Sequence, residues 1–196
     1  KAEVSSPIVM QMSDTLFLMA EEKGDQRMQA VALCNKLDYF YYKNDQPDSI
    51  SHYVEIVKDF ARKTNQPKYY YFVWSKRLIY YYIKQYQYNI ALYEANKMMK
   101  EAEQEKYMDG IANAYNVLSS IYQLKRLFNL AINNKKKEIE ITLQYNLNKF
   151  NLSIYYSGLT NLYCELGEAD NALENLNKSA SCLYSSTQEY YYYVRA

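Results

Sequence analysis

The sequence predicts an all-α fold, a solenoid of stacked helix pairs, on three observations. Tyrosines 41, 82, 122 and 163 recur in steps of 41, 40 and 41 residues. Nine residues after each tyrosine stands a small or aliphatic residue, namely Ile50, Ala91, Ala131 and Ala172. The 196 residues include only 4 glycines and 3 prolines, which suits long helices and disfavours a sheet with many turns. Such a period indicates helix pairs that bury their apolar faces by stacking.

The same spacing divides the chain into one repeat array over residues 1–196. Its predicted parts are the second helix of a partial repeat at 7–24, four repeats at 26–64, 67–105, 107–145 and 149–185, and the start of a further helix at 188–196. Pro7 suits a first helical turn, where the missing N–H has no partner in any case. Gly167 can take the left-handed conformation that ends a helix.

The second helices differ in how clearly they show a buried face. In residues 87–105 one face carries Ala91, Ala95, Met98 and Ala102. Residues 168–184 show the clearest stripe, formed by Ala169, Ala172, Leu176, Ala180 and Leu183. Residues 127–145 fit least well, because Lys135 and Glu138 stand where apolar or small residues are expected. That helix is either rotated, or its stripe runs through Leu130, Ile139 and Leu143.

The pattern within each repeat resembles that of a known family. The last repeat reads Tyr156-x-x-Leu159-Thr160-x-x-Tyr163 and then Ala172-x-x-x-Leu176, and related patterns begin at Cys34, Ser75 and Tyr115. It is similar to the tetratricopeptide signature W-x2-L-G-x2-Y…A-x3-F, with repeats of about 40 rather than about 34 residues. The resemblance spans nearly the whole chain and implies a right-handed α-solenoid. The repeat core it implies is Leu37, Tyr41, Leu78, Tyr82, Ala91, Leu118, Tyr122, Ala131, Leu159, Tyr163 and Ala172.

Composition argues against several classes of function. A net charge of +1 and a pI near 7.7 leave no electrostatic footprint for direct nucleic-acid binding. No apolar run reaches the roughly 18 residues of a membrane span, so we expect no membrane contact. No phosphate-binding loop, hydrolase or metalloprotease motif occurs. We therefore predict no enzyme, no cofactor and no metal. The lone His52 is expected on a solvated helix face, and Cys34 and Cys164 are expected in core packing.

Tyrosine is the most unusual feature of the composition. The chain has 25 tyrosines, several of them in runs, and successive residues of a helix point in different directions. Such runs cannot lie wholly in a core. One interpretation is that tyrosine replaces phenylalanine and tryptophan in packing, as an AT-rich genome would favour. The other interpretation is an aromatic binding groove, since tyrosine is enriched in recognition surfaces.

The family resemblance also implies where such a groove lies. In tetratricopeptide arrays the first helices line a concave face. Transferring that register predicts the ligand-binding residues Asn35, Tyr39, Tyr42, Lys76, Tyr80, Lys84, Asn113, Asn116, Ser120, Gln123, Ser157 and Asn161. These amides, hydroxyls and ammonium groups could hydrogen-bond an extended peptide or a small polar ligand. They depart from the family's lysine and asparagine clamp for C-terminal carboxylates, so we do not predict that specificity.

Membership of this family would imply a non-catalytic binding module with a protein or peptide ligand. In style the chain resembles the sensor regions of signalling proteins, such as two-component systems, in Bacteroides-type bacteria. We therefore expect the ligand- or protein-sensing region of a larger bacterial signal-transduction protein, with further domains beyond Ala196. This favours an extracytoplasmic, periplasmic location, with the cytoplasm as the alternative. The alternative function is a scaffold for protein–protein interaction in an assembly.

Overall fold

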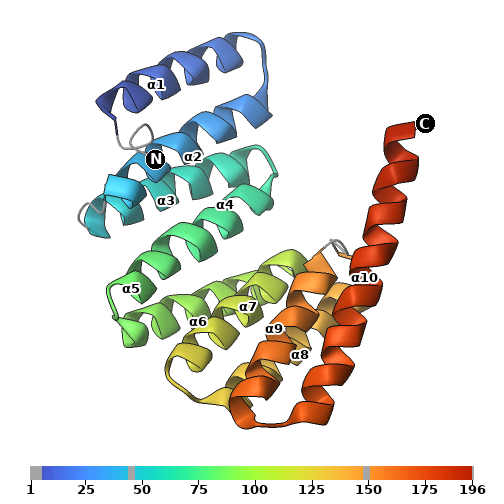
Figure 1. Cartoon of the computed structure of the whole chain (residues 1–196). Coiled ribbons are helices and arrows are strands. Elements are labelled where there is room, and N and C mark those ends of the chain that lie inside the picture. Colours follow the sequence, from blue (N-terminus) through green and yellow to red (C-terminus); the bar gives the residue numbers. More distant parts are fainter. Residues whose placement is uncertain (1–5, 44–46, 148–150, 196) are drawn as a thin grey trace. The chain divides into compact units, whose positions relative to one another are not determined.

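The computed structural model describes residues 6–43, 47–147 and 151–195, with side chains to position 182, and every regular element in these ranges is helical. Figure 1 shows them in order. They are α1 Pro7–Glu22, α2 Gln26–Lys43, α3 Pro47–Lys63, α4 Pro67–Val73, the π-helical segment η1 Trp74–Ile79, α5 Tyr80–Lys84, α6 Tyr88–Gln104, α7 Met108–Leu124, α8 Phe128–Gln144, α9 Leu152–Leu166 and α10 Ala169–Arg195. The all-α prediction is confirmed for this part of the chain.

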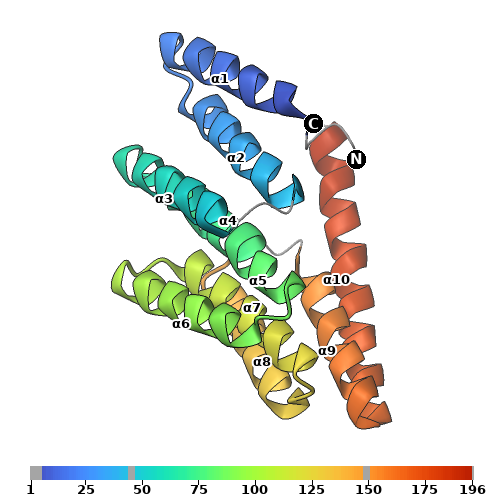
Figure 2. The same cartoon turned by 90° about the vertical axis from the view of Figure 1, so that its left-hand side faces the viewer.

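The chain forms two compact units, Lys1–Glu94 and Ala95–Ala196, and the division falls within α6. In the first unit α1 packs on α2, α2 on α3, and α3 on α4 and η1. In the second unit α7 packs on α8, α8 on α9, and α9 on α10, which lie side by side in both views (Figures 1 and 2). Helices that follow one another in the sequence are therefore neighbours within each unit.

Helix ends are set by residues with special backbone properties. All three prolines begin a helix, at Pro7, Pro47 and Pro67. A left-handed residue with φ between 51° and 74° ends the helix before it at Gly24, Asn65, Tyr86, Lys106, Arg126, Asn146 and Gly167. From Asn65 onward these residues recur every 20 or 21 positions, so two helices fill each period of 40 or 41 residues. At each of them the N–H of the next residue donates to the carbonyl five residues before it, as from Glu168 to Tyr163, which satisfies a terminal carbonyl.

The small residues predicted at the points of closest helix contact are buried. Ile50, Ala91 and Ala131 are fully buried and Ala172 is nearly so, and Ala95, Met98 and Ala102 complete the predicted face of α6. At Ala131 the backbone carbonyl accepts a 2.8 Å hydrogen bond from Ser119 Oγ on α7. This hydrogen bond shows that α7 and α8 approach each other closely at the small residue Ala131.

The structure corrects the two stripes predicted for α8 and α10. In α8 Lys135 and Glu138 are themselves buried, whereas Leu130 and Leu143 are about half exposed. In α10 the buried residues are Ala172, Asn175 and Ser179, while Ala169, Leu176 and Ala180 are exposed and the side chain of Leu183 lies outside the described part. Polar residues can take these buried positions because each finds a partner: Ser179 Oγ donates to the backbone carbonyl of Ser153 at 2.8 Å.

Two helices differ in extent from the prediction. Residues 67–85, the predicted first helix of the repeat at 67–105, contain the π-helical turn η1 between α4 and α5. The break expected before residue 188 is absent, because α10 continues to Arg195. Ser185, Ser186 and Thr187 are compatible with a helix interior, and no glycine or proline occurs after Gly167 to end it.

Candidate functional site

Six of the residues predicted to line a groove lie in the first unit, on α2, η1 and α5. Tyr42 and Lys84 are exposed, and Asn35, Lys76 and Tyr80 are half-buried. Tyr39 is buried, with its ring 5.1 Å from that of Phe40, so it is a packing residue and the prediction that it lines an open groove is wrong. The tetratricopeptide register places residues by α-helical spacing alone and does not anticipate which ring the neighbouring helices cover.

Around Tyr42 and Lys84 the structure assembles a cluster of cations and aromatic rings that the sequence pattern does not reveal. We call it the Arg77 cluster; it consists of Asp38, Tyr41, Tyr42, Phe72, Arg77 and Lys84. The Arg77 guanidinium donates two hydrogen bonds to the Asp38 carboxylate. Nε donates to Oδ1, and Nη2 donates to Oδ2 at 3.0 Å. Although burial lowers the pKa of Arg77, the hydrogen bond and charge of Asp38 raise it above its ordinary value. The guanidinium is therefore a permanent cation.

Aromatic rings surround both cations of the Arg77 cluster. The guanidinium carbon of Arg77 lies 5.2, 5.9 and 5.4 Å from the ring centroids of Tyr41, Tyr42 and Phe72. Lys84 Nζ lies 4.1 Å from the Tyr41 centroid. The cluster contains two cations, Arg77 and Lys84, and one carboxylate, Asp38, so it carries an excess positive charge. Tyr42 is 53% exposed and Phe72 45% exposed, so the rings also offer apolar surface to a partner.

The π-helical segment η1 places Arg77 in this cluster. Its first residue, Trp74, is 2% exposed and stacks on Tyr70 with ring centroids 5.0 Å apart. Its indole Nε1 donates to Glu94 Oε2 at 2.9 Å. A π-helical turn changes the direction of the side chains that follow it, and such turns occur frequently at functional sites. No glycine or proline marks this one, so the sequence offered no signal for it.

The cysteines occupy unlike surroundings. Burial raises the pKa of the Cys34 thiol to about 12, the charge of Asp38 adds to this and that of Arg77 opposes it. Cys164 is exposed, so the prediction that it packs in the core is wrong: the face of α9 that carries it is not covered. His52 is exposed, as predicted.

We expect a thiol-alkylating reagent at pH 8 to modify Cys164 at least ten times faster than Cys34 in the folded protein. The reactive species is the thiolate, and Cys34 is both shielded and held as the neutral thiol. Mass spectrometry of peptides after timed quenching measures the two rates. In urea the two cysteines should be alkylated at equal rates. Equal alkylation rates in the folded protein as well would show that the fold does not protect Cys34.

The other six predicted groove residues lie in the second unit, and one of them is committed to a buried network. Asn116 Nδ2 donates to Glu138 Oε1 at 2.8 Å, and Lys135 Nζ donates to Glu138 Oε2 at 2.7 Å. Both carboxylate oxygens thus have donors. Burial, reinforced by the Glu138 charge, raises the pKa of Tyr155 beside this network to about 12. Asn116 is half-buried and its amide is already bonded to Glu138, so we assign it to the fold and not to a groove.

The remaining residues of that set lie on accessible surface. Ser120 and Gln123 border a hollow of about 460 Å³ together with Leu124, Arg126, Phe128 and Glu165. Asn161 is exposed, and Asn113 and Ser157 are half-buried. Within the described ranges no group of three or more His, Cys, Asp or Glu side chains is placed to hold a metal ion. None of the described helices is long and apolar enough to cross a membrane.

Comparison with known proteins supports the fold. No protein-family model matches the chain, and no curated protein matches it in sequence. Among solved structures it is similar to BtubC (BKLC) from P. vanneervenii, with a TM-score of 0.60 and 12% sequence identity over 94% of this chain and 82% of that one. At this identity the likeness concerns the fold alone. Together with the regular helix spacing, it identifies this chain as an all-helical, repeat-like protein.

Proposed function

We propose that the chain is a non-catalytic binding module, a right-handed tetratricopeptide-like solenoid whose first helices form a surface for an extended protein or peptide segment. The regular helix pairs and the structural likeness to BtubC support the repeat architecture. In this proposal the module is the sensing region of a larger bacterial signal-transduction protein, and binding of its ligand is the input signal.

The Arg77 cluster is the observation that carries the proposal. Its rings pack against the Arg77 guanidinium, which Asp38 holds in place, so little side-chain entropy is lost when a partner covers them. Lys84 is exposed, and its ammonium lies over the rings of Tyr41 and Tyr42. Its ammonium can therefore pair with a carboxylate of the partner. We infer a partner segment that combines acidic and apolar side chains.

The test is selection of binders from a displayed library of random 12-residue peptides, followed by affinity measurement on variants. We expect Tyr42→Ala/Lys84→Gln to weaken the selected peptides at least tenfold, about 1.4 kcal/mol. The matched control is Tyr93→Ala/Lys100→Gln, which removes an exposed tyrosine and an exposed lysine from α6. Selected peptides without acidic residues, or equal losses in both variants, would contradict this site. Asn116→Ala is unsuitable as a probe because it opens the buried network of Glu138.

An outward apolar stripe on α10 favours the second candidate function, a scaffold in a protein assembly. Leu173 and Leu176 are 59% and 50% exposed. The residues 41 positions earlier, Ile132 and Lys135 on α8, are buried. An added helix could cover the α10 stripe in the same way. The test compares the double variants Leu173→Ser/Leu176→Ser and Tyr42→Ala/Lys84→Gln in binding to a partner protein. Loss of binding in the first variant, with binding retained in the second, would favour the scaffold over the sensor.

A further inference from the structure

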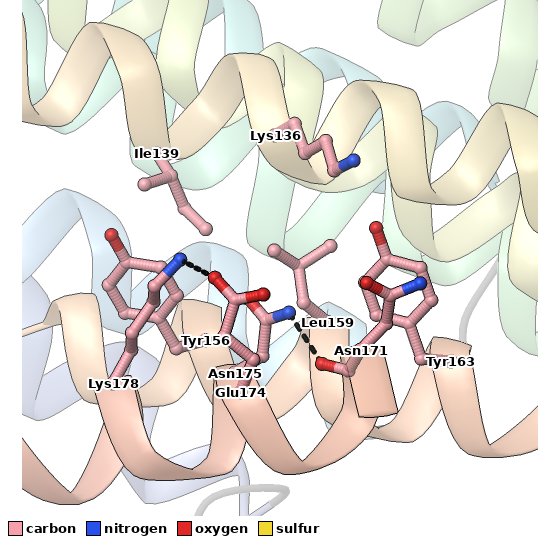
Figure 3. A pocket seen from close by; sticks show the side chains of 9 residues that line it. All are labelled: Lys136, Ile139, Tyr156, Leu159, Tyr163, Asn171, Glu174, Asn175 and Lys178. Atoms are coloured by element: carbon pink, nitrogen blue, oxygen red, sulfur yellow. Dashed lines mark hydrogen bonds and ion pairs between the residues drawn. The ribbon is translucent and has the colours of Figure 1, made fainter. Parts of the chain in front are cut away.

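A pocket of about 220 Å³ opens in the second unit, among α8, α9 and α10 (Figure 3). Its lining residues are Lys136, Ile139, Tyr156, Leu159, Tyr163, Asn171, Glu174, Asn175 and Lys178. None of them belongs to the surface proposed above, so the evidence for this pocket is independent of the evidence for that surface. The pocket is smaller than the about 300–1,000 Å³ of sites for drug-sized ligands, which limits its occupant to a compact molecule.

The floor and ends of the pocket are apolar or aromatic. Leu159 and Ile139 are 3% and 6% exposed and form its floor. Tyr156 and Tyr163 lie two turns apart on α9, and Figure 3 shows their rings on either side of Leu159. A flat apolar group between the two rings would contact aromatic surface at both ends. Ring-to-ring contacts of this kind contribute beyond the burial of area alone.

Two lysines, Lys136 and Lys178, lie at the rim, and they differ in the partners that their ammonium groups contact. Lys178 Nζ is paired with the Glu174 carboxylate on the same helix, as the dashed line in Figure 3 marks. The hydrogen bond from Lys178 lowers the pKa of Glu174, so this carboxyl is charged at neutral pH and neutralises Lys178. Lys136 on α8 lies over the Tyr163 ring, with Nζ 5.6 Å from the centroid. Lys136 is therefore the cation best placed to receive an anionic group.

The amides on the α10 side complete the polar rim. Asn175 is 7% exposed, and its Nδ2 donates to the backbone carbonyl of Asn171 at 2.8 Å, which fixes the side chain in one orientation. In Figure 3 both asparagines lie along the edge that faces Leu159. The pocket thus has an apolar floor with aromatic ends, bordered by one available ammonium and an ordered amide. Few precisely placed polar groups around an apolar cavity are typical of small-molecule sites.

We propose that this pocket binds a small aromatic carboxylic acid, with the ring over Leu159 between Tyr156 and Tyr163 and the carboxylate on Lys136. A carboxylate is preferred to a phosphate because Lys178 is already neutralised by Glu174, which leaves the ammonium of Lys136 to match one negative charge. A single-ring acid also suits the size of the cavity, because it fills the cavity without projecting far into solvent.

The probes are N-acetyl-L-phenylalanine and its amide, which differ only in the carboxylate, titrated to about 10 mM so that a Kd near 1 mM is measurable. Methyl NMR signals of Ile139 and Leu159 report occupancy. We expect the acid to bind at least tenfold more tightly than the amide. Lys136→Gln should abolish that difference. Lys137→Gln, the same change one residue along, where Nζ lies 5.3 Å from the Tyr115 centroid, should preserve it.

Three results would overturn the assignment. The first is no shift of either methyl group at the highest concentration, and the second is equal binding of acid and amide. The third is that the peptide Ala-Ala-Ala-Phe binds more than tenfold more tightly than N-acetyl-L-phenylalanine, which would assign the pocket to peptide ends. Because Lys136 is exposed, its replacement leaves the core intact, and an unchanged thermal melt verifies this.

Discussion

Replacing Glu138 with alanine is expected to lower the free energy of unfolding by about 3–5 kcal/mol. The side chain is 1% exposed, and its two carboxylate oxygens accept hydrogen bonds from Lys135 and Asn116. Without it, the Lys135 ammonium remains among α8 and α9 side chains with no counter-charge, because Lys135 is itself only 8% exposed. An uncompensated buried charge costs far more than the ion pair contributes. Urea denaturation followed by far-UV circular dichroism measures the loss.

The double variant Lys135→Met/Glu138→Leu separates the two contributions. It removes both charges and keeps similar volume, so we expect a stability within about 1 kcal/mol of the parent or above it. Lys137→Met on the exposed side of α8 is the control for losing a lysine from this helix. A Glu138→Ala loss below about 1 kcal/mol would mean that water reaches the Lys135 ammonium.

Trp74→Ala is expected to destabilise the first unit by about 3–5 kcal/mol, the range for deleting a buried large aromatic side chain. Trp74 is fully enclosed, stacks on Tyr70 and Tyr71, and supplies a hydrogen bond to Glu94. The cavity would lie within η1, whose Ser75 and Ile79 are also buried. Far-UV circular dichroism is the measurement, because the substitution removes the only tryptophan.

The matched variant Trp74→Phe keeps most of the aromatic packing and loses the indole N–H. We expect it to cost about 1–3 kcal/mol, since Glu94 then lacks this donor. Phe72→Ala removes a 45% exposed aromatic from the same segment and should cost less than Trp74→Ala by at least about 1 kcal/mol. Equal losses for Trp74→Ala and Phe72→Ala would show that η1 is not the packed element described above.

The repeat architecture was predictable because it depends on local rules. A period of 40 or 41 residues, alanine at Ala91, Ala131 and Ala172, and proline or glycine at helix ends each act within one helix pair. The burial of those alanines follows from the close approach of adjacent helices. The left-handed residues Tyr86, Lys106 and Arg126 were harder to foresee, because any residue can be forced into that conformation when the helix before it must end there.

The candidate site was only partly predictable. Tyr42 and Lys84 were identified by transferring the family register, and both are exposed. Arg77, which organises the cluster around them, was missed because its partner Asp38 lies 39 residues earlier on another helix. Tyr39 has the same residue type and helical spacing as an exposed groove residue, yet it is covered. Residue type and spacing on one helix do not report what a neighbouring helix covers.

The series of paired helices follows from the amino-acid sequence, since helix length, helix ends and the small contact residues are encoded within each repeat. Which polar groups are buried, and which are accessible to a ligand, depends on how the helices pack. Lys135 and Glu138 stand where the repeat pattern expects apolar or small residues, and they are buried there because each finds its counter-charge in the other. A charge can be buried only where neighbouring helices supply its partners, and the sequence of a single helix does not show which partners those are.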